Sequence, residues 1–245
     1  MIKCAYARQE KAARHEATGF AAWVASGTGM PLANAIMDYT NIFILLGCGR
    51  RFDPQLPAWS DYIRGLRHNP DKDAEYTLAV WQSRPPVAPP DVVGRSGCFS
   101  FSLETDRSAR IHFDRTDGTV SPLCDSEVAA RQRELCGLLA QIVTLTPAVK
   151  TLRGLSWLYH HHRYRRLFPP AYLRSAMPVT DRYRNMPLWG QFLRWDGSLR
   201  AERASHLYQH IQGEFHPSRL ATGFPLQPLA VSAPVTVFQA FYARR

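Results

Sequence analysis

The stretch that decides the fold of this chain is FSFSLETDRSARIHF, residues 99–113. Apolar and polar residues alternate over 99–104 and again over 110–114, on either side of a polar turn at 105–108. Alternation with a period of two, on both sides of a short polar loop, is typical of an antiparallel hairpin with one buried face. We therefore expect a β-hairpin here, as part of an antiparallel sheet.

Beyond the hairpin, the pattern alternates between helices and strands. Ser121 and Pro122 are suited to begin a helix whose apolar stripe runs to Ile142. The stretch 188–195 is expected to form a strand, and 226–242 one or two strands interrupted by Pro234. The sequence therefore predicts an α+β fold, in which a helical N-terminal part precedes an antiparallel sheet packed with helices.

The N-terminal third has the composition of helices, with Ala, Glu, Lys, Arg and Gln frequent before Gly27 and further helical stretches after it. Four prolines in the six residues PPVAPP, 85–90, form an extended connector, because proline fixes its backbone torsion and lacks a hydrogen-bond donor. We predict a mainly helical region over 1–84, a Pro-rich connector over 85–97 and an α+β domain over 98–245.

The composition is that of a folded, basic protein. Of the 245 residues 45% are hydrophobic, which excludes wholesale disorder. The net charge of +10 arises from 26 Arg and only 4 Lys against 20 acidic residues, a skew that a GC-rich coding sequence also produces. A net positive charge favours anionic partners such as nucleic acid, acidic membranes or anionic metabolites.

The cysteines and the N-terminus indicate in which cellular compartment the protein is expected. The five cysteines are widely spaced, which argues against a disulfide framework or a structural zinc site. Charged residues interrupt the N-terminus, and the longest purely apolar run, 20–25, is far shorter than a membrane span. We expect a cytoplasmic protein with no membrane span.

The segment 153–196 is the strongest candidate for ligand recognition. It holds eight arginines against two aspartates, and nine aromatic residues are interleaved with them. Guanidinium groups donate charge-assisted hydrogen bonds to phosphate, and flat rings stack on bases. Arg163 and Arg166 are three residues apart on an expected helix, so they would share one face. The expected ligand-binding residues are Arg153, Trp157, Arg163, Tyr164, Arg166, Arg182 and Arg184.

The histidines are weaker candidates for a functional site than the arginines. His160, His161 and His162 are consecutive, a poor geometry for one metal ion and one that fits solvated or packing side chains. His206 and His210, four residues apart behind Glu202, would share a helix face, as metal-binding pairs do, although a surface ladder is the favoured explanation. We therefore predict no metal site, with His206 and His210 as the weak candidates.

Motifs for known reactions are missing from the sequence. No P-loop and no complete dinucleotide fingerprint occurs, so the sequence predicts no cofactor and leaves any catalytic residue unidentified. The order after residue 98, a hairpin followed by alternating helices and strands, is similar in topology to acyl-CoA N-acetyltransferases. That family's R/Q-x-x-G-x-G/A turn, which grips pyrophosphate, is absent, so the resemblance is one of topology.

Three classes of function fit these observations. The first is a basic protein that recognises a phosphate-bearing ligand, such as nucleic acid, through the segment 153–196. The second is an enzyme acting on an anionic small molecule, with the acyltransferase-like topology. The third is a protein–protein interaction or assembly protein, including a homo-oligomer, because Trp, Tyr and Arg also dominate interfaces. We take the first as the working hypothesis.

Overall fold

The protein, seen in a computed structural model, divides into two compact units. The first comprises residues 1–90 and 181–225, and the second comprises 91–180 and 226–245. The structure describes residues 17–49, 52–83, 91–114, 120–179, 188–192, 194, 200–212 and 224–243. The segment 181–225 thus belongs to the helical first unit, whereas the sequence predicted it as part of the α+β domain over 98–245.

The described part of the first unit is helical, as expected for the N-terminal part. Residues 17–28 are helical, and the segment 188–192 contributes a 3-10 helix. The other elements are α2 (Leu32–Tyr39), α3 (Ile42–Leu45), α4 (Pro57–Arg64), α5 (Pro70–Ser83), η3 (Leu188–Phe192) and α9 (Ala201–Gln212).

Aromatic packing holds the first unit together. The ring of Trp59 contacts those of Phe43 and Tyr62, with centroid distances of 4.9 Å and 5.3 Å. Phe224 contacts Phe20 at 6.2 Å and Phe192 at 5.7 Å. These two contacts explain why a segment far along the chain joins the N-terminal helices.

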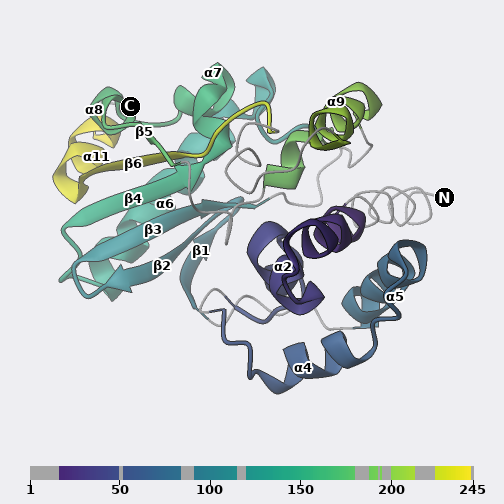
Figure 1. Ribbon diagram of the computed structural model, residues 1–245. Helices are drawn as coiled ribbons and strands as arrows, with labels where there is room; N and C mark the ends of the chain where they lie inside the picture. Colours follow the sequence, from purple (N-terminus) through teal and green to yellow (C-terminus); the bar gives the residue numbers. More distant parts are fainter. Residues whose placement is uncertain are drawn as a thin grey trace. The chain divides into compact units, whose positions relative to one another are not determined.

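In the residues that the structure describes, the sheet unit contains six strands in the order β1-β2-β3-β4-β6-β5 (Figure 1). The strands are β1 (Val92–Ser96), β2 (Phe99–Thr105), β3 (Ser108–Phe113), β4 (Thr151–Ser156), β5 (Met177–Pro178) and β6 (Leu229–Pro234). Strand β1 lies within the predicted connector and extends the sheet, because Val92, Gly94, Arg95 and Ser96 each pair with a residue of β2. The hairpin prediction is confirmed: β2 and β3 are antiparallel, and Phe101 lies opposite Ile111.

The sheet is mixed, so the expectation of a purely antiparallel sheet is wrong. Strands β3 and β4 run parallel, with Arg110 beside Arg153, and α6 (Val128–Leu145) connects them. Parallel neighbours need a crossover of this kind, since a tight turn can join only antiparallel strands. The α+β class itself is confirmed.

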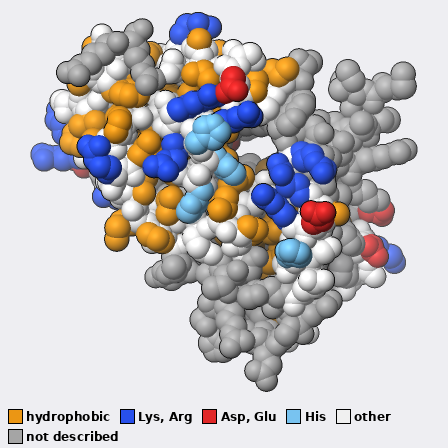
Figure 2. Space-filling model, turned by 90° about the horizontal axis from the view of Figure 1, so that it is seen from above, with side chains coloured by type: hydrophobic (Ala, Val, Ile, Leu, Met, Phe, Trp, Pro, Cys, Tyr) orange, Lys and Arg blue, Asp and Glu red, His pale blue; other side chains and the backbone are white. Residues whose placement is uncertain are grey.

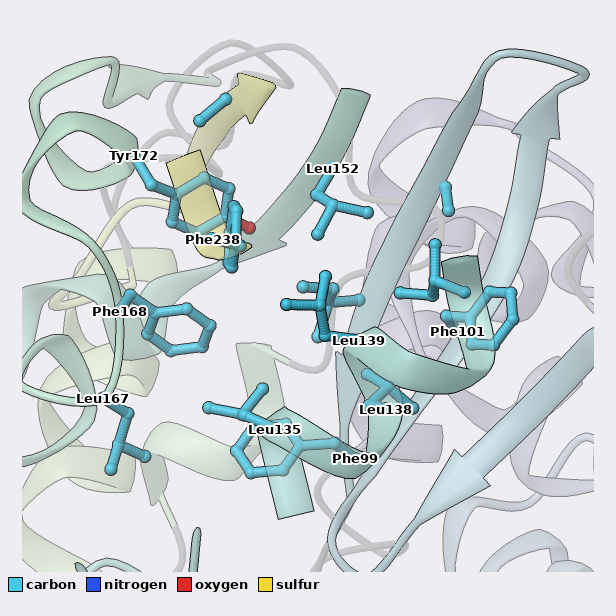
Figure 3. Close-up of a cluster of buried hydrophobic side chains, with 14 of the residues drawn as sticks. Phe99, Phe101, Leu135, Leu138, Leu139, Leu152, Leu167, Phe168, Tyr172 and Phe238 are labelled. Carbon is cyan, nitrogen blue, oxygen red and sulfur yellow. The ribbon is translucent and has the colours of Figure 1, made fainter. Parts of the chain in front are cut away.

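One face of the sheet carries the core of this unit. The other helices here are η1 (Asp125–Glu127), η2 (Trp157–His160), α7 (His162–Arg165), α8 (Pro170–Arg174) and α11 (Val235–Tyr242). Leucines of α6, phenylalanines of β2 and rings from α8 and α11 meet in a single buried cluster (Figure 3). Phe99, Phe101 and Tyr172 are each 0% exposed, so the part of this face that they occupy is shielded from solvent.

Two strand predictions in the C-terminal half are wrong. Residues 188–192 form a 3-10 helix, and residues 235–242 form α11 after β6 ends at Pro234. The sequence VTVFQAFY favours a strand locally, yet Phe238 packs its ring 4.9 Å from that of Tyr172. Burial of Val235 and Phe238 on one helical face therefore outweighs the local preference.

Candidate anion-binding site

The basic segment begins where β4 ends. Ser156 caps η2 by accepting a hydrogen bond of 3.1 Å from the amide of Leu158, and α7 follows directly. Because β3 and β4 are parallel, η2 lies at their carboxyl end. In open sheets with parallel strands, ligands bind preferentially at this end. The cap at Ser156 and the sheet topology therefore put the start of the basic segment at the end of the sheet where ligands commonly bind in such folds.

Most described aromatic residues of the segment lie in the core. Tyr159, Tyr164, Phe168 and Tyr172 are all at most 3% exposed. The Tyr164 and Phe168 rings lie 4.9 Å apart, and the hydroxyls of Tyr159 and Tyr172 share a hydrogen bond of 3.0 Å. Burial raises the pKa of all three tyrosines well above the usual value. The Tyr164 ring therefore supports the surface from below instead of facing solvent.

The side chains around the buried Tyr164 are exposed and basic. We call His160, His161, His162, Arg163 and Arg165 the basic surface; all five are exposed. Histidine and arginine side chains lie next to each other in the view from above (Figure 2). The His161 ring contacts the half-buried Trp157 at 5.2 Å, and His160 Nε2 lies 2.9 Å from the carbonyl oxygen of Gln227. These contacts fix the backbone that presents the charges.

Arg163 and Arg166 do lie close to one anion, and that anion is Asp125. Arg166 Nη1 donates to Asp125 Oδ1 at 2.6 Å, and Arg163 Nη2 lies 3.7 Å from Oδ2. Arg166 also donates to the carbonyl oxygens of Leu123 and Cys124 at 3.3 Å. The hydrogen bond from Arg166 and the charges of both arginines lower the pKa of Asp125. Arg166 therefore anchors the segment before α6, whereas Arg163 keeps half of its side-chain surface exposed.

Sequence reasoning missed Asp125, which lies 38 and 41 residues before the two arginines that it contacts. The available signal was the pair of acidic residues, Asp125 and Glu127, directly before a helix, where negative charge is favourable. That pattern predicts the start of a helix, but it does not predict which basic residues pair with Asp125.

The remaining predicted residues lie elsewhere. Arg153 projects from the middle of β4, and its Nη1 lies 3.7 Å from Glu104 Oε2. Arg182 and Arg184 lie outside the described residues. His206 is exposed on α9, and the side chain of His210 is also outside the described part. Among the residues that the structure describes, no group of His, Cys, Asp and Glu has metal-binding geometry.

Comparison of the chain with protein families, with characterised proteins and with solved structures gives no match. In the described part of the chain, no helix is both long and apolar enough to span a membrane.

Proposed function

We propose that this protein binds a phosphate-bearing anionic ligand through the basic surface. The observation that carries the proposal is the run 160–165, in which five of six side chains are exposed and are cationic or can be protonated, while Tyr164 is buried among them. Charged groups held on a fixed backbone lose less entropy when they bind an anion than charges on a free loop.

The described aromatics suggest how such a ligand would be recognised. Since the rings of Tyr159, Tyr164 and Tyr172 are buried, they support the surface and do not stack on bases. Contacts with phosphate oxygens would then supply the affinity, and binding would depend on charge more than on base identity. Single-stranded nucleic acid is the polymeric ligand that we test first.

The test is fluorescence anisotropy with a labelled single-stranded oligonucleotide over a range of salt concentrations. Replacing Arg163 and Arg165 by Ala should weaken binding and reduce the salt slope by about 1.4, at about 0.7 for each lost phosphate contact. The matched control is Arg107→Ala, an exposed arginine in the turn before β3, at the opposite end of that strand from the basic surface. Equal weakening in both variants, or no weakening in the double variant, would contradict the proposal.

Asp125 supplies a second arm of this experiment. Its carboxylate occupies the position between Arg163 and Arg166 that a phosphate would take. Asp125→Asn removes the competing charge and should increase affinity for the oligonucleotide and for inorganic pyrophosphate. Weaker binding in this variant would instead indicate that the ion pairs with Asp125 hold the arginines in position for the ligand.

An enzyme that uses an acyl-CoA is the second candidate. The supporting observation is the connectivity: an antiparallel meander, β1 to β3, followed by a helical crossover to the parallel β4, as in the topology considered above. Topology alone does not establish activity. Calorimetric titration with coenzyme A distinguishes the candidates, because saturable binding that the oligonucleotide does not displace would favour the enzyme.

A further inference from the structure

Helix α6 has an outer side that carries very little charge. Its inner side holds the buried leucines of the core, and the opposite side holds a second stripe, whose positions are spaced four and three residues apart. That stripe consists of Ala129, Arg133, Cys136, Ala140 and Val143. All five residues are exposed, and Val143 is 42% exposed. We call these five residues the outer stripe.

The composition of the second half of α6 is that of a buried helix. From residue 135 to residue 149 the chain contains no charged side chain. Gln141, which has the one amide side chain of this run, donates to the carbonyl oxygen of Arg95 at 2.9 Å and thereby holds the helix to β1. A surface helix normally has charged residues on its outer side, and a helix that is apolar all round is normally buried. The outer stripe therefore has the character of a contact surface.

The one charged residue of the outer stripe is Arg133. The carboxylates of Glu127 and Glu134 both form ion pairs with Arg131, and in the part of the chain that the structure describes Arg133 has no acidic partner. An arginine packs its aliphatic stem on apolar side chains, and its guanidinium binds the carbonyl oxygens at the C-terminus of a helix. Arg133 is therefore suited to lie beside an apolar residue at the negative end of another helix.

The spacing of the outer stripe is symmetric about residue 138. Positions 136 and 140 are equally far from it along the helix, and so are positions 133 and 143. Two antiparallel copies of α6, related by a two-fold axis at residue 138, would place Cys136 opposite Ala140 and Arg133 opposite Val143. The central side chains are small, so the helix axes can approach to about 8 Å, the lower end of the usual range. Because α6 ends at Leu145, each Arg133 would also reach the negative end of the other helix.

We propose that the outer stripe is a dimer interface, covered by the outer stripe of a second, antiparallel copy of this chain. A closed two-fold pair presents the same surface twice, and the symmetry of the stripe about residue 138 meets that requirement, which a different partner protein would not impose. Charge complementarity supports the same occupant, because Arg133 of each copy meets the C-terminus of the other copy's α6. The inference does not depend on the basic surface, which belongs to η2 and α7.

The test is sedimentation equilibrium of the full chain over a range of protein concentrations, where we expect a monomer–dimer equilibrium. Val143→Lys should weaken dimerisation about tenfold or more, because it places a like charge opposite Arg133 on both sides of the two-fold axis. Val143→Glu is the matched variant: it removes the same apolar contact but places a carboxylate opposite Arg133, so it should weaken dimerisation much less. Arg133→Glu combined with Val143→Lys should restore the dimer.

Cross-linking tests the antiparallel register. Ala140→Cys places a thiol opposite Cys136 of the other copy, so oxidised glutathione should join the two chains in a disulfide that appears as a covalent dimer on a non-reducing gel. Lys72→Cys, at an exposed position of α5, should give no more covalent dimer than the wild-type chain. A chain that stays monomeric at every concentration, equal weakening by Val143→Lys and Val143→Glu with native circular dichroism spectra, or equal cross-linking at positions 72 and 140 would overturn the proposal.

Discussion

Gly154 shows how one residue determines the packing beneath the candidate site. A Cβ placed on it would overlap the hydroxyl oxygens of both Tyr159 and Tyr172. Those hydroxyls bond each other next to β4, and their rings belong to the buried cluster. The absence of a side chain at 154 therefore allows the tyrosines to fill the core below the basic surface.

We predict that Gly154→Ala destabilises the protein by about 1–3 kcal/mol, the usual cost of overpacking a core. The measurement is the midpoint of urea unfolding. Adding Tyr159→Phe to the variant should restore part of the loss, since it removes one of the two overlapping oxygens. Gly19→Ala is the matched control: nothing lies within 4 Å of its Cβ, and Ala is expected to stabilise that helix by about 0.5–1 kcal/mol. Equal stability in wild type and Gly154→Ala would show that the tyrosines move apart freely.

At the scale of elements, the sequence predicted structure formed within a short segment, but it did not predict contacts between segments far apart in the chain. The β2–β3 hairpin follows from alternation within 15 residues, and the shared face of Arg163 and Arg166 follows from their spacing of three. Neither signal names Asp125, nor does any reveal that β4 runs parallel to β3, because both depend on contacts between remote segments.

The tyrosine cluster joining η2, α7 and α8 leads to a prediction about alkaline pH. Burial raises the folded-state pKa of Tyr159, Tyr164 and Tyr172 well above that of an exposed tyrosine. The unfolded chain therefore releases these protons at lower pH than the folded one. The stabilisation is fully present below the ordinary tyrosine value of about 10 and is lost as pH rises above it.

Phenolate absorbance near 295 nm, recorded with circular dichroism over an alkaline titration, checks this expectation. Tyrosines that are not fully buried should titrate first, without loss of structure. The buried three should ionise only together with loss of the helical signal, and Tyr172→Phe should reduce the amplitude of that second phase. Ionisation of every tyrosine in one phase, while the circular dichroism spectrum stays native, would contradict the assignment.

At the scale of the whole molecule, the C-terminal residues 226–245 complete the sheet unit. Strand β6 lies between β4 and β5, and its register with β4 runs over six residue pairs. Without residues 226–245 the strand β4 would lose its antiparallel neighbour, and Tyr172 would lose its contact with Phe238. The buried apolar area supplied by α11 would be lost as well, since Val235 and Phe238 both belong to the core.

We therefore predict that a chain ending at residue 225 loses the cooperative unfolding of the sheet unit, although it keeps every residue of the first unit and the whole basic surface. Thermal denaturation followed by near-ultraviolet circular dichroism tests this: the truncated chain should lose the part of the signal that comes from the aromatic cluster around Tyr172, whereas the part from the rings of the first unit should remain. The basic surface should then bind the oligonucleotide more weakly, because its rigid support at the end of β4 is gone. Retained cooperative unfolding, with unchanged oligonucleotide affinity, would show that β1 to β4 with α6 form a stable sheet without β6 and that the basic surface acts independently of the sheet.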